Sequence, residues 1–221
     1  MSLFRLSVAL LGVSAFAATP SYVPSEPPTQ LKSLLKDIEN RYNGAKTLQV
    51  SFTEQYTPAG RPQRMESGTL YLRKPLRMRC EYAFPKGKLC VSDGTFLYVY
   101  TPADNRALKM KLKDSLADDM RAPLAFLLGK LHFSKEFRSL QARPEGDDMR
   151  ITAEPKTDNL PYSSVEFVVT PSSQIREVKV TGFDRSIYDF TFEQEKMDPP
   201  LDAKLFQFQT PPGAVLEETA Q

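Results

Sequence analysis

Apolar residues recur with a helical period near the start of the chain. They fall at steps of three and four residues, at Leu31, Leu34, Leu35, Ile38 and Tyr42. This spacing puts them on one face of an amphipathic helix. The pattern predicts a helix from Gln30 to about Gly44, because glycine commonly follows the last helical turn. A helix of this kind needs a second layer against which it can bury its apolar face.

Short segments of β-rich composition follow, with turn residues between them. The predicted strands are 48–52, 68–72, 76–82, 89–92 and 96–100, and then 149–153, 164–170, 175–181 and 187–193. Neighbouring strands joined by tight turns pair most economically as an antiparallel meander. The chain is therefore predicted to be mainly β with a few helices, of the α+β class, and to form one domain over residues 30–217 with a tail at 218–221.

The pattern changes between Leu112 and Leu131, where it becomes helical. Pro123 occupies the position of a first-turn proline. The four residues Leu124, Phe126, Leu127 and Leu128 then make a segment that is apolar on most sides. Two interpretations stay open, an ordinary core helix and a movable cover, because periodicity does not distinguish them.

The N-terminus has the layout of a secretory signal peptide. Arg5 precedes an apolar run from Leu6 to Val13 and an A-x-A site at 15–17. We expect cleavage after residue 17, with a flexible proline- and serine-rich lead-in over 18–29. A membrane anchor is the alternative, but the run is shorter than the roughly 18–20 residues that span a bilayer. No cysteine follows the site, so no lipid anchor is expected.

Charge and side-chain chemistry exclude several functions. The 29 basic and 27 acidic residues leave a net charge of +2, which gives no overall bias toward nucleic acid. His132 is the single histidine, and the sequence contains no nucleophile motif, metal-binding motif or glycine-rich phosphate loop. The sequence therefore predicts a protein without enzymatic activity, without a metal and without a cofactor.

The two cysteines flank a predicted hairpin turn at 84–87. If the turn is centred on Pro85, residues whose numbers sum to 170 face each other, and Cys80 then lies opposite Cys90. An oxidising compartment would permit a disulfide between them. Two free buried thiols are the alternative at this stage.

Several segments in order resemble a known family. They are Gly68-Thr69-Leu70-Tyr71-Leu72-Arg73-Lys74-Pro75, Glu81-Tyr82, Val91-Ser92-Asp93-Gly94 with 96–100, then 123–129, and finally 202–213. Together they resemble the outer-membrane lipoprotein carrier family, the LolA type, over most of residues 31–217.

The resemblance implies an incomplete antiparallel β-barrel, closed by a helical lid over an apolar cavity that accepts acyl chains. It implies a monomeric periplasmic carrier that takes acylated lipoproteins from an inner-membrane ABC transporter to an outer-membrane lipoprotein receptor, without binding nucleic acid. Carriage of another lipid, or a periplasmic sensor of lipoproteins or lipids, is the alternative.

The resemblance also assigns residues. The acyl cavity would be lined by Phe52, Met78, Cys80 and Tyr82, and the lid would present Leu124, Phe126, Leu127 and Leu128. Lys74 stands where the family often has an arginine that latches the lid, and Cys80 stands where relatives commonly have tryptophan. The competing interpretation is that these residues form the ordinary core of a closed barrel.

Overall fold

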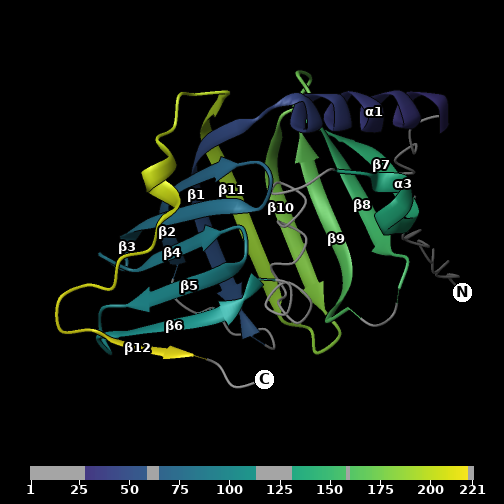
Figure 1. Cartoon of the computed structure of the whole chain (residues 1–221). Coiled ribbons are helices and arrows are strands. Elements are labelled where there is room, and N and C mark those ends of the chain that lie inside the picture. Colours follow the sequence, from purple (N-terminus) through teal and green to yellow (C-terminus); the bar gives the residue numbers. More distant parts are fainter. Residues whose placement is uncertain (1–27, 59–64, 113–130, 158–159, 219–221) are drawn as a thin grey trace, which may run out of the picture.

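One sheet of twelve strands dominates the computed structural model, which describes residues 28–58, 65–112, 131–157 and 160–218 (Figure 1). The first part of the chain forms α1 (Pro28–Gly44), β1 (Thr47–Thr57), β2 (Met65–Arg73), β3 (Arg77–Phe84), β4 (Leu89–Asp93), β5 (Phe96–Thr101) and β6 (Arg106–Lys111). The second part forms α3 (Phe133–Glu136), β7 (Phe137–Glu145), β8 (Asp148–Pro155), β9 (Tyr162–Val169), β10 (Ile175–Gly182) and β11 (Ile187–Met197). The chain ends with the 3-10 helix η3 (Ala203–Phe206) and β12 (Val215–Glu218).

Two antiparallel meanders, β1–β6 and β7–β11, share this sheet. The strand order is β12-β6-β5-β4-β3-β2-β1-β11-β10-β9-β8-β7, so the pairing of β1 with β11 joins the two meanders. The last strand, β12, adds to β6 in parallel. The sheet curls without closing (Figure 1), which confirms the predicted mainly β, half-barrel architecture.

The core lies between α1 and the face of the sheet that we call the inner face. Ile38 and Tyr42 of α1 are buried against it, and α1 begins at Pro28, two residues earlier than expected. Beneath the helix the inner-face residues are fully buried, including Ile151, Val165, Phe167, Val178 and Val180. The predicted apolar face of the helix therefore covers the β8–β10 part of the sheet, as Figure 1 shows.

The opposite, outer face of β3 and β4 is covered by the C-terminal segment. Phe206 of η3 is 1% exposed, and Phe208 stacks on Tyr98 of β5 with ring centroids 4.8 Å apart. Arg79 donates a hydrogen bond to the Leu205 carbonyl. The segment thus packs across the outer face before β12 pairs with β6.

The sequence pattern did not reveal β6, β7 and β12. In β6 (RALKMK) and β7 (FRSLQARPE), charged and polar residues interrupt the apolar alternation that predicts a strand. In β12 (VLEE) the run is too short for alternation to be recognised. β6 and β7 form hairpins with their neighbours β5 and β8, whereas β12 forms by pairing with the distant β6.

Candidate functional site

Apolar side chains form two cross-strand rows on the inner face of β1–β6. The first row runs through Leu48, Leu72, Met78, Ser92, Leu97 and Met110. The second row runs through Val50, Leu70, Cys80, Cys90, Val99 and Leu108. Directly paired residues on one face lie about 5 Å apart, so the second row is a continuous apolar strip. The first row is apolar except at Ser92, whose hydroxyl donates a hydrogen bond to the Leu76 carbonyl.

The rows are less buried where α1 does not cover the sheet. Val50 and Leu72 are 2% exposed, whereas Leu108 at the far end of its row is 41% exposed. Leu97, Val99 and Met110 are half-buried. Exposed apolar surface that continues from a core is a common mark of a binding site. In β4, Ser92 and Cys90 are buried, so the accessible part of the inner face lies mainly on β5 and β6.

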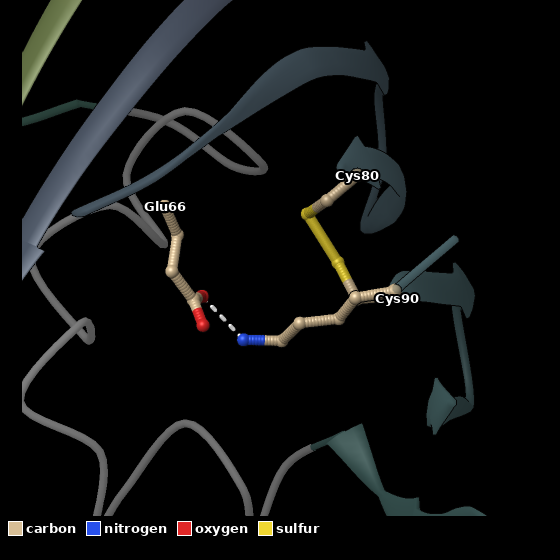
Figure 2. Close-up of a disulfide and its surroundings, with 4 residues drawn as sticks. Glu66, Cys80 and Cys90 are labelled. Carbon is tan, nitrogen blue, oxygen red and sulfur yellow. Dashed lines mark hydrogen bonds and ion pairs between the residues drawn. A yellow bond between two sulfur atoms is a disulfide. The ribbon is translucent and has the colours of Figure 1, made fainter. Parts of the chain in front are cut away.

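A disulfide lies within the second row. Cys80 pairs with Cys90 across β3 and β4, their Cα atoms are 4.9 Å apart, and the Cys80–Cys90 bridge is formed (Figure 2). The register of this hairpin has the predicted sum of 170 at every pair from Arg77–Asp93 to Glu81–Leu89. The bridge places a compact apolar group in the row and leaves no free thiol there.

The four residues predicted to line an acyl cavity share the inner face. Phe52 and Tyr82 are buried and meet edge to face, with ring centroids 5.3 Å apart. Met78 and Cys80 are half-buried and pack against the core from the same side. The structure thus brings the four side chains to one surface, at the border between the sealed core and the accessible rows.

The predicted lid residues Leu124, Phe126, Leu127 and Leu128 lie outside the described residues. The residues that flank this range are both buried: Leu112 is 3% exposed and Leu131 is 1% exposed. Leu112 follows β6, near one edge of the sheet, and Leu131 precedes β7, which forms the other edge. Leu112 and Leu131 therefore lie toward opposite edges of the open sheet.

Lys74, the predicted latch, contacts the C-terminal turn of α1. Its ammonium donates a hydrogen bond to the Tyr42 carbonyl, and its backbone N–H donates to the Lys46 carbonyl at 2.9 Å. Burial lowers the pKa of Lys74, while the Asp198 carboxylate acts in the opposite direction. A cation suits the negative end of the helix dipole. The described contacts of Lys74 thus belong to helix capping, and the latch stays a prediction.

Two polar residues of α1 bind the segment that follows the predicted lid. The Asn43 side chain contacts both the N–H and the carbonyl of Leu131, and Glu39 accepts a hydrogen bond from the Phe133 N–H at 2.8 Å. Sequence reasoning missed this role, because polar residues on the outer side of an amphipathic helix look the same whether they face solvent or another segment.

A second missed feature is an ion pair on the inner face. The Lys88 ammonium pairs with the Glu66 carboxylate, and it lies 4.4 Å from the centroid of the Tyr82 ring. Figure 2 shows the Glu66 side chain and the disulfide directed into the same space. A contact that joins β2, β3 and the turn before β4 leaves no local sequence pattern.

The outer face carries a hollow of about 510 Å³ beside Gly68. Its polar lining consists of Ser51, Thr53, Ser67, Thr69 and Glu81, which alternate along the strands with the inner-face residues. Phe52 and Tyr82, which are predicted to bind acyl chains, also contribute to the lining, together with Ala83. Hydroxyl and carboxylate groups do not suit alkyl chains, so the polar side of this hollow is a poor site for them.

The described residues form no cluster of potential metal ligands. Among them, no group of three or more His, Cys, Asp or Glu residues is placed to hold an ion. The same described ranges contain no helix with the length and apolar character needed to cross a membrane.

Curated relatives of the chain share one description. This chain is 25% identical over 189 residues to the outer-membrane lipoprotein carrier protein of Pectobacterium carotovorum subsp. carotovorum (strain PC1). The match covers 84% of this chain and 88% of the relative. The chain is 24% identical over 185 residues to the protein of the same description from Yersinia pestis bv. Antiqua (strain Angola), covering 82% and 87%.

Solved structures show the same fold at low identity. A conserved protein from Thermus thermophilus superposes with a TM-score of 0.50 at 12% identity, covering 86% of this chain and 99% of that one. The structure of MucB gives a TM-score of 0.50 at 12% identity, covering 85% and 66%. The family model described as outer membrane lipoprotein carrier protein LolA matches residues 43–209. Because this match covers more than half of the chain, the chain belongs to the LolA family.

Proposed function

We propose that this protein is a periplasmic carrier that binds the acyl chains of lipoproteins on the inner face of β1–β6. Membership of a lipoprotein carrier family supports the general role, that of a binding protein rather than an enzyme. The observation that carries the proposal is the pair of apolar rows that continues from the sealed core to the 41% exposed Leu108. Alkyl chains laid along these rows would leave water without requiring a polar partner.

A carrier must bind its lipoprotein cargo and also release it, which limits the net free energy of binding. Burial of ten methylene groups stabilises a complex by roughly 8 kcal/mol, at about 0.8 kcal/mol each. Burial of several whole chains without an opposing cost would hold the cargo too tightly. We propose that the predicted lid with Leu124, Phe126, Leu127 and Leu128 covers the rows when the cavity is empty, so that cargo binding must displace it and the net affinity falls.

The direct test is native mass spectrometry of the full chain, expressed in a Gram-negative periplasm together with lipoproteins and then purified. The matched variants are Leu97→Asp, which puts a charge in the first apolar row, and Thr53→Asp, which puts one on the outer face. We expect acylated protein bound to wild type and to Thr53→Asp, and its loss from Leu97→Asp. Circular dichroism verifies that both variants are folded.

Two outcomes overturn the proposal. Wild-type protein without any acylated species would contradict carriage, and equal loading of both variants would contradict the assigned face. Bound lipid without acylated protein would replace lipoprotein carriage with carriage of another lipid.

We further propose the route from an inner-membrane ABC transporter to an outer-membrane receptor. The test is release of lipoproteins from transporter-containing vesicles and their delivery to receptor-containing vesicles, with and without the protein. Release without delivery would contradict the second half of the route.

A further inference from the structure

The inner face changes from apolar to charged along β1. Successive inner-face residues are Leu48, Val50, Phe52 and then Glu54, which is 6% exposed. Glu54 lies directly opposite Glu66 of β2, which in turn pairs with Lys88. The apolar end of this surface lies near α1, and the charged end lies at the opposite ends of the strands.

The Glu66–Lys88 pair is largely removed from solvent. The Glu66 side chain is 15% exposed and the Lys88 side chain is 18% exposed. Desolvation of such a pair offsets much of its mutual attraction, so a well-packed apolar pair would stabilise the fold about as well. Stability by itself therefore gives little reason for an ion pair on an otherwise apolar surface.

The pair also adjoins the residues assigned to acyl chains. The Lys88 ammonium lies over the ring of Tyr82, and Tyr82 contacts Phe52. Cys80, two residues before Tyr82 in β3, belongs to the second apolar row. An amphiphile lying along the rows with its chains toward α1 would thus bring its polar end to Glu66 and Lys88.

We propose that Glu66 and Lys88 form a subsite for the dipolar head of an acylated ligand, a group with both a hydrogen-bond donor and an acceptor, such as an amide. This inference rests on the proposed function. The ammonium carries three N–H donors and the carboxylate accepts only, so together they match a head that contains an N–H and a C=O. A head with a net charge is attracted by one member of the pair and repelled by the other, so it gains less than a dipolar head that contacts both favourably.

The test measures the affinity of three ligands by their displacement of a bound fluorescent probe. The ligands share a chain of the same length and differ in the head: N-tetradecanoylglycinamide, tetradecanoate and tetradecylammonium. Wild type should bind the amide most tightly. Glu66→Gln should raise the affinity for tetradecanoate relative to tetradecylammonium about fivefold, and Lys88→Met should lower that ratio about fivefold, as expected for one charge at short range in a partly screened site. Because each ratio is measured within one protein sample, a partly unfolded variant does not distort it.

The matched control is Arg138→Met, which removes one partner of the exposed Arg138–Glu154 pair, whose side chains are 51% and 52% exposed. In Arg138→Met the affinity for tetradecanoate relative to tetradecylammonium should equal that of wild type. Ratios unchanged in both Glu66→Gln and Lys88→Met, with all three ligands bound, would overturn the subsite and leave the carrier function intact. Failure of every ligand to bind wild type would instead overturn the carrier function. A tetradecanoylated peptide and a ceramide, which share the amide, then distinguish a protein cargo from a lipid cargo.

Discussion

Asn43 of α1 holds the backbone of Leu131 through both ends of its side-chain amide. Its Nδ2 donates to the Leu131 carbonyl at 2.8 Å, and its Oδ1 accepts from the Leu131 N–H at 2.6 Å. Leu131 is 1% exposed and directly follows the segment predicted to be the lid. The C-terminal root of that segment is therefore fixed to the helix that covers the core.

Asn43→Ala should destabilise the protein by about 1–3 kcal/mol, because it leaves two buried backbone groups of Leu131 without a partner. Chemical denaturation measures the change, and hydrogen exchange at Leu131 should accelerate. The control is Ser51→Ala, which removes an exposed side-chain hydrogen bond to Gln194 and should cost less than about 1 kcal/mol. An Asn43→Ala variant as stable as wild type would show that the clamp contributes nothing.

Gly68→Ala should weaken the pairing of β2 with β3. A Cβ atom at Gly68 would lie 2.1 Å from the Glu81 carbonyl oxygen, so backbone must shift at a point where the strand register is already irregular. We expect a loss of about 1–3 kcal/mol or more from this overpacking, measured by denaturation.

Gly44→Ala is the matched control for this substitution. A Cβ at Gly44, the last residue of α1, meets nothing within 4 Å, so alanine there should be neutral or stabilise by about 0.5–1 kcal/mol. Equal effects of the two substitutions would contradict the steric explanation.

The Cys80–Cys90 bridge joins residues separated by 10 positions. Its loss in a Cys80→Ala, Cys90→Ala double variant should cost about 2–3 kcal/mol, because the unfolded chain gains freedom. Reductant should lower the free energy of unfolding of wild type by a similar amount and leave that of the double variant unchanged. A reductant effect on the double variant would mean that the bridge is not the origin of the change.

Tyr42 predicts an alkaline loss of stability. Its hydroxyl donates to Glu195 at 2.8 Å and accepts from the Ile175 N–H at 2.8 Å, and burial, together with the Glu195 carboxylate, raises the pKa of Tyr42. A pKa raised in the folded state contributes stability that is complete below the unfolded value of about 10 and is lost as pH rises above it.

The measurement is the difference in free energy of unfolding between wild type and Tyr42→Phe as a function of pH. Near neutral pH the variant should be less stable by about 1–3 kcal/mol, since the Ile175 N–H loses its partner. Above pH about 10 the difference should shrink, because only wild type loses the tyrosine contribution. A difference that is constant across this range would contradict the raised pKa of Tyr42.

Local patterns predicted much of the fold. The three- and four-residue spacing of α1 predicted both the helix and its buried face, since helix periodicity depends only on neighbouring residues. The register of the β3–β4 hairpin was predicted to the residue, because a turn centred on Pro85 determines which residues face each other. The ends of its strands differ from the predicted 76–82 and 89–92 by up to two residues.

Only the tertiary structure decided the contacts between segments that are distant in the sequence. The pairing of β1 with β11, the addition of β12 to β6 and the clamp between Asn43 and Leu131 each join residues at least 88 positions apart. The Glu66–Lys88 pair likewise depends on the turn between β3 and β4 lying beside β2. Side-chain periodicity determines which face of an element is apolar, but not which partner covers it, because that depends on packing and hydrogen bonding across the whole sheet. By itself the sequence therefore determined α1 with its buried face, the strands other than β6, β7 and β12, and the family resemblance. Only the tertiary structure decided where the apolar rows stay accessible and where they end in charge, because both depend on which segments cover which face of the sheet.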